Sequence, residues 1–155
     1  MKIAVCDDEK IFSEMMREVL EQYFRSLDVE IRTFSSGTAL LREVKKDPYA
    51  YFCIFLDIEM PVLSGIETAE ELKKERISVP VILLTSHEEY ALRGYEVGAF
   101  RFLVKPVNME KLHHALEAVE KQKMLDQRLI VSQDGRDVYL PMNQILYFKS
   151  ENVYI

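Results

Sequence analysis

Residues 52–61 read FCIFLDIEMP, a run of five apolar residues that ends in an acid, Asp57. A continuous apolar run of this length is typical of a strand buried on both faces of a parallel sheet. A carboxylate at its end adds nothing to packing, and a buried charge without a partner is costly. The same pattern opens the chain, where KIAVC (residues 2–6) runs into Asp7 and Asp8. Two apolar strands that both end in acid predict a polar site at one edge of a sheet.

Strand-like and helix-like patterns alternate along the rest of the first 120 residues. Five strands are expected at 2–6, 30–34, 51–56, 80–85 and 100–104. Between and after them, apolar residues spaced three or four apart predict five helices. The first covers about 10–26, and the second is capped by Ser35 or Ser36 and ends before Pro48. The third follows Gly65, the fourth is a weaker one over about 88–97, and the fifth is capped by Asn108. The alternation predicts an α/β fold with a parallel sheet covered on both faces.

Composition excludes several other classes of protein. The chain has 155 residues, 48% hydrophobic and 30% charged, which suffices for one buried core and part of another domain. The net charge of −6 argues against a broad basic surface for nucleic acid. No apolar run approaches the roughly 20 residues of a membrane span, and the N-terminus does not resemble a secretory signal. Cys6 and Cys53 lie within apolar strands and are expected to be buried free thiols, so a cytoplasmic location is predicted.

The sequence changes character from about Met124. LIVSQDGRDVYL (129–140) contains two strand-like segments around Asp134-Gly135, a hairpin signal. QILYFKSENVYI (144–155) is again rich in strand-forming residues, and the chain stops inside an apolar run. We expect a first domain at 1–122, a linker at 123–128, and a truncated, mostly-β segment at 129–155.

Polar residues end or follow four of the five predicted strands: Asp7, Asp8, Asp57, Thr85 and Lys105. In open parallel sheets, ligands bind along the edge formed by the carboxyl ends of the strands. Three carboxylates there raise one another's pKa unless a cation joins them. Mg²⁺ is a hard cation that takes oxygen ligands and leaves room for phosphate. We expect Asp8 and Asp57 as direct magnesium ligands, with Asp7 holding a metal-bound water and a backbone carbonyl near Glu59 completing the shell.

Such a site favours phosphoryl chemistry. A carboxylate whose charge is offset by a cation can act as a nucleophile on phosphorus and form an aspartyl phosphate. Lys105 would supply positive charge to the transferred group and Thr85 a hydroxyl donor. Asp57 ends a central strand and lies in the middle of the cluster, so it is the residue expected to be modified.

Four motifs in order resemble those of the receiver domain of two-component response regulators. They are CDDE (6–9), DIEMPVLSG (57–65), LTS (84–86) and FRFLVKP (100–106). The resemblance implies a flavodoxin-like (βα)5 doubly wound parallel sheet in the strand order 2-1-3-4-5. It also implies that Asp57 accepts phosphate from a sensor histidine kinase, and that the chain is not an enzyme beyond self-phosphorylation and slow autodephosphorylation.

The same resemblance assigns roles around Asp57. Thr85 and Phe102 would be the switch pair, and Lys105-Pro106 would be a cis peptide. Phe102 departs from the more frequent tyrosine and has no hydroxyl. His87 and Glu59 occupy positions that tune the phosphoryl lifetime in this family.

The tail resembles the start of a LytTR-type DNA-binding domain in ILYFKSENVYI (145–155). This implies a regulator that dimerises on activation and controls transcription through DNA contacts of its C-terminal domain, with no membrane partner. A stand-alone receiver that acts through protein–protein contacts is the alternative. Two other classes fit less well. A magnesium-dependent phosphatase of the haloacid dehalogenase type would need a second aspartate two residues after Asp57, where this chain has Glu59. A flavin carrier would need a phosphate-cradling loop after the first strand.

Overall fold

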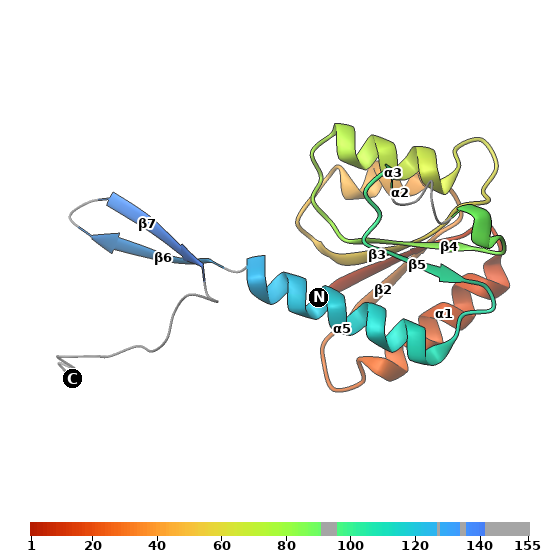
Figure 1. Cartoon of the computed structure of the whole chain (residues 1–155), viewed down its shortest axis with the longest axis horizontal. Helices are drawn as coiled ribbons and strands as arrows, with labels where there is room; N and C mark the ends of the chain where they lie inside the picture. The colour runs from red at the N-terminus through yellow and green to blue at the C-terminus, as the bar shows by residue number, and fades with distance from the viewer. Residues whose placement is uncertain (91–95, 127, 134–135, 142–155) are drawn as a thin grey trace. The chain divides into compact units, whose positions relative to one another are not determined.

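Five parallel strands form the central sheet of this computed structural model, in the order β2-β1-β3-β4-β5 (Figure 1). They are β1 (Lys2–Cys6), β2 (Glu30–Phe34), β3 (Tyr51–Asp57), β4 (Val81–Thr85) and β5 (Arg101–Val104). The structure describes residues 1–90, 96–126, 128–133 and 136–141. The order is that of the flavodoxin-like fold, as predicted, and strand order reverses between β1 and β3, where ligands bind in such sheets.

Helices cover both faces of this sheet. They are α1 (Lys10–Tyr23), α2 (Gly37–Val44), α3 (Gly65–Lys74) and α5 (Met109–Asp126), with a short 3₁₀ helix, η1 (Glu88–Tyr90). Figure 1 shows α2 and α3 on one face, and α1 and the beginning of α5 on the other. The helix expected over 88–97 begins as η1, and residues 91–95 of it lie outside the described part of the chain.

The core follows the apolar runs seen in the sequence. Every residue of β4 is buried, as are four of five in β1 and six of seven in β3. These three strands are the middle of the sheet, so both of their faces pack against helices. Both cysteines are buried free thiols, as expected.

Polar side chains cap the starts of α2, α3 and α5; the caps of α2 and α5 were predicted and that of α3 was not. Ser36, not Ser35, caps α2 by accepting a hydrogen bond from the Ala39 N–H. Ser64 and Glu67 form a capping box at the start of α3. Asn108 accepts a hydrogen bond from the Lys111 N–H at 3.0 Å and so caps α5.

The chain divides into two compact units, Met1–Ala115 and Leu116–Ile155. α5 continues to Asp126, so residues 123–126, the first part of the expected linker, are helical. The second unit contains the antiparallel pair β6 (Arg128–Gln133) and β7 (Arg136–Pro141), the hairpin predicted around residues 134–135. The expected strand-rich stretch at 144–155 lies outside the described residues. Within the described chain, no helix is both long enough and apolar enough to span a membrane.

Candidate phosphoacceptor and metal site

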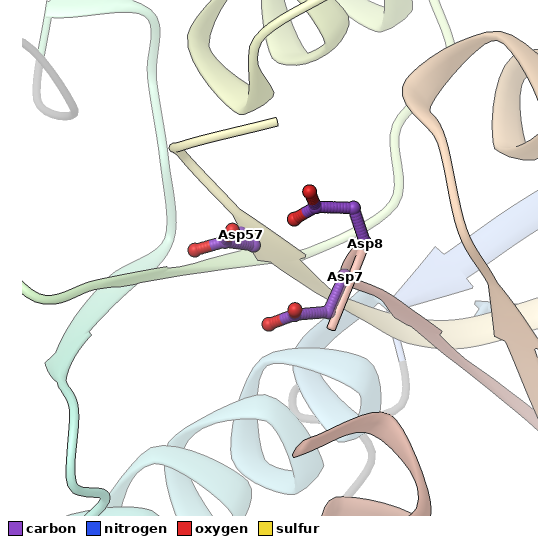
Figure 2. Close-up of side chains that lie close together, drawn as sticks. All are labelled: Asp7, Asp8 and Asp57. Carbon is purple, nitrogen blue, oxygen red and sulfur yellow. The ribbon is translucent and has the colours of Figure 1, made fainter. Parts of the chain in front are cut away.

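Three carboxylates meet at the carboxyl edge of the sheet (Figure 2). Asp57 is the last residue of β3, and Asp7 and Asp8 directly follow β1. β1 and β3 are paired in parallel with Cys6 opposite Leu56, so the residues after them emerge side by side. One oxygen from each of Asp7, Asp8 and Asp57 lies within 4.8 Å of the others.

The cluster combines buried and exposed acids. Asp7 and Asp57 are only 1% and 2% exposed, whereas Asp8 is open to solvent. Burial raises the pKa of Asp57, and the charge of Asp7 raises it further, against a smaller opposing effect of Lys105 and of a backbone hydrogen bond from Glu59. The charged form of Asp57 is therefore less favourable than that of a solvent-exposed aspartate, and a further cation would stabilise it.

Lys105 is the cation that the chain itself brings to this cluster. It follows β5, and its Nζ donates a hydrogen bond of 2.6 Å to Asp7 Oδ2 and lies 3.1 Å from Asp57 Oδ1. Burial lowers the pKa of Lys105, but the hydrogen bond to Asp7 and the charge of Asp57 outweigh this effect and raise it overall. One ammonium thus bridges the two buried acids and offsets part of their repulsion.

The donor set suits a hard divalent cation. Three carboxylates supply oxygen ligands at one point, as Mg²⁺ requires, and the exposed Asp8 leaves a path from solvent. Asp57 Oδ1 is buried and accepts no hydrogen bond from the described residues, and its close charged neighbour is Lys105 Nζ at 3.1 Å. Buried carboxylate oxygens normally have such a partner, so this oxygen is available to a ligand.

The remaining predicted site residues surround this cluster. Thr85, at the end of β4, is fully buried, and its hydroxyl accepts a hydrogen bond from the His87 N–H at 3.1 Å and donates to the His87 carbonyl at 3.4 Å. The Glu59 carboxylate lies apart from the three acids: it approaches His87 Nε2 to 3.3 Å and accepts a bond from the Ser86 N–H. The expected metal contact through a backbone carbonyl near Glu59 stays a prediction.

Two further features named by the resemblance, Phe102 and the Lys105-Pro106 peptide, lie on β5 and just after it. Phe102, on β5, is half-buried and packs against the main core cluster. Lys105-Pro106 is a cis peptide, as expected.

Two contributors to the site were not predicted. Gly65 begins α3 directly against the end of β3, where an added Cβ would lie 2.1 Å from the Asp57 carbonyl oxygen. Phe12, which the sequence places on the apolar face of α1, has its ring centroid 4.2 Å from Lys105 Nζ. The only sequence signals of these contacts are spacings: Gly65 follows Asp57 by eight residues, and Phe12 follows Asp8 by four.

Comparison with known proteins identifies the arrangement. The model of the response regulator receiver domain matches residues 3–117. A receiver domain structure from Clostridium thermocellum superposes with a TM-score of 0.70 at 33% identity, covering 80% of this chain and 98% of that one. The response regulator TrrA from Thermotoga maritima, solved in complex with Mg²⁺-BeF, gives a TM-score of 0.66 at 31% identity, over 76% of this chain and 97% of that one.

Two curated relatives are similar to this chain, one over about the length of the receiver and the other over the whole chain. The positive alginate biosynthesis regulatory protein of Pseudomonas aeruginosa is 31% identical over 123 residues, 78% of this chain and 48% of the relative. The sensory transduction protein LytT of Bacillus anthracis is 28% identical over 157 residues, 100% of this chain and 61% of the relative. The chain therefore spans about half to three-fifths of these proteins.

Proposed function

The chain belongs to the response regulator receiver family through residues 3–117, and on this premise we propose that it is a phosphorylation-activated switch of a two-component system. The observation that supports this most is the meeting of Asp7, Asp8 and Asp57 with Lys105 at one sheet edge. Asp8, Asp57 and a backbone carbonyl near Glu59 would hold Mg²⁺, with Asp7 holding a metal-bound water, and the ion would supply charge neutralisation and a contact for the incoming phosphoryl group.

Asp57 is the proposed phosphoacceptor. Its carboxylate oxygen forms a bond to phosphorus as the bond from phosphorus to the donor breaks, and the electron pair of that bond leaves with the donor. The natural donor is a phosphohistidine of a sensor histidine kinase, whose imidazole then takes up a proton. Lys105, already 3.1 Å from Asp57 Oδ1, offsets the charge of the transferred group. The same site hydrolyses the aspartyl phosphate slowly, and no other substrate is turned over.

Thr85 and Phe102 are the proposed switch. The Thr85 hydroxyl now closes a turn with His87, and moving it toward the phosphoryl group would break that turn and free space beside the half-buried Phe102. A phosphoryl group that contacts Thr85 in only one of the two arrangements would shift the population toward that arrangement.

The output proposed is transcriptional control by a homodimer through a LytTR-type DNA-binding domain. The similarity to LytT over the whole of this chain and the β6–β7 hairpin beyond α5 support this reading. A receiver that acts by protein contacts alone is the second candidate.

The chemistry is tested by intact-mass spectrometry after incubation with Mg²⁺ and acetyl phosphate. The native chain is expected to gain the mass of one phosphoryl group, whereas the chain with EDTA and the Asp57→Asn variant gain none. An unchanged native mass, or a phosphate that persists in Asp57→Asn, refutes the proposal.

A further inference from the structure

Phe12 lies in the first turn of α1, five residues after Asp7, and its ring contacts the ammonium of Lys105. We propose that Phe12 is a positioning residue that holds Lys105 at the phosphoacceptor site through a cation–π contact. The inference rests on the proposed phosphorylation of Asp57 and adds to it a residue outside the motifs that define the site.

The geometry confines the ammonium on three sides. Nζ lies 2.6 Å from Asp7 Oδ2, 3.1 Å from Asp57 Oδ1 and 4.2 Å from the centroid of the Phe12 ring. A separation below about 6 Å over a ring face is attractive, and the attraction increases when the cation is removed from water. The Lys105 side chain is 12% exposed, so its ammonium is largely desolvated.

A bound divalent cation would weaken the attraction of Asp7 and Asp57 for Lys105 but not that of the Phe12 ring. A divalent ion held by Asp7 and Asp57 draws on the same negative charge that now attracts Lys105. The neutral ring of Phe12 is not a ligand of that ion, so its attraction for the Lys105 ammonium persists. A lysine stem has four flexible carbons, so the backbone alone does not fix the ammonium. Phe12 is therefore the partner that keeps Lys105 near Asp57 while the carboxylates bind the metal and Asp57 accepts the phosphoryl group.

Simple packing is the competing explanation, since aromatic residues on an amphipathic helix are usually core. The two explanations differ in what the side chain needs to provide. Packing requires apolar volume, which leucine largely preserves, whereas a cation–π contact requires a ring face, which tyrosine preserves and leucine does not.

The test measures the rate of phosphorylation by acetyl phosphate with saturating Mg²⁺ in Phe12→Leu and Phe12→Tyr. We expect Phe12→Leu to be about three- to tenfold slower, with Phe12→Tyr close to native. Phe24→Leu is the matched control, because it makes the same change at a buried ring at the far end of α1; its rate should equal the native rate. Native rates in Phe12→Leu, or a Phe12→Tyr as slow as Phe12→Leu, overturn the proposal.

A double-mutant cycle isolates the contact with Lys105. In a Lys105→Gln background, measured over longer times, Phe12→Leu should cause no further loss of rate, and an undiminished loss contradicts the inference. NMR gives a readout that needs no phosphorylation: the ring current of Phe12 should shift the Lys105 ε-CH2 resonances, and Phe12→Leu should remove that shift. If the native chain accepts no phosphate, the proposed function fails, and the NMR comparison still decides whether Phe12 holds the ammonium.

Discussion

Replacing Gly65 by alanine is expected to damage both the fold and the phosphoacceptor. The new Cβ would lie 2.1 Å from the carbonyl oxygen of Asp57, 2.8 Å from its carbonyl carbon and 2.9 Å from the Cα of Ile58. All three atoms belong to the backbone at the end of β3, so no side chain can rotate out of the way. The Gly65 N–H also donates to the Ile58 carbonyl at 3.0 Å, which ties the start of α3 to this same segment.

The size of the effect follows from the overlap. A carbon and an oxygen normally approach to roughly 3.2 Å, so α3 and the end of β3 must separate by about 1 Å. Overpacking of this kind costs about 3 kcal/mol or more when the neighbours cannot relax. A displacement of about 1 Å at a reacting group can also reduce a rate by about 10²-fold. Urea unfolding monitored by circular dichroism measures the first effect, and the rate of phosphorylation by acetyl phosphate measures the second.

Gly98→Ala is the matched control. Gly98 has a φ of +81°, but among the described residues its added Cβ would meet nothing closer than Lys73 Nζ at 4.0 Å. This variant should lose about 1 kcal/mol from the left-handed backbone alone and keep the native phosphorylation rate. The reasoning is refuted if Gly65→Ala is as stable as Gly98→Ala or is phosphorylated at the native rate.

Three further predictions concern stability in EDTA, each measured by urea unfolding. Because the folded-state pKa of Asp57 is raised above its ordinary value of 3.8, its charge destabilises the fold increasingly as pH rises through that raised pKa. Asp57→Asn should therefore be more stable than the native chain at pH 7, and a gain that does not shrink as the pH falls toward 3.8 would show a different cause. Val62 is β-branched, 99% exposed and held at a φ of 70°, so Val62→Asn should gain about 1 kcal/mol, and a loss would contradict the strain argument. Ser64→Ala removes half of the capping box with Glu67 and should lose about 1 kcal/mol, most of which Ser64→Asp should restore; an Asp variant as unstable as the Ala variant would exclude the cap as the cause.

The strands, and the meeting of Asp7, Asp8, Asp57 and Lys105 at one sheet edge, were predictable because each depends on local pattern. Continuously apolar runs predicted β1, β3 and β4, and parallel strands bring whatever follows them to one edge. Helix ends were less predictable. Apolar spacing suggested a first helix to about residue 26, whereas α1 ends at Tyr23 and Phe24 is its C-cap. No Gly or Pro marks this end, and Phe24 remains in the apolar pattern because it is buried after the helix has stopped.

The contacts of Lys105 were beyond the reach of sequence reasoning. Its position after β5 indicated a role at the site, but its hydrogen bond to Asp7 spans 98 residues and its contact with Phe12 joins it to α1. These partners depend on how the helices pack on the sheet and on the rotamer of a long side chain. Likewise, the engagement of the Thr85 hydroxyl by the His87 backbone depends on a turn that the motif LTS does not specify.

Calorimetric titration of the metal-free chain with Mg²⁺ most directly tests the idea that the three carboxylates form one divalent site. Asp8 is the exposed member, so Asp8→Asn removes a ligand without disturbing the buried pair. We predict one ion per native chain and binding at least tenfold weaker in Asp8→Asn. No heat of binding in the native chain, or an affinity that Asp8→Asn leaves unchanged, would contradict the account.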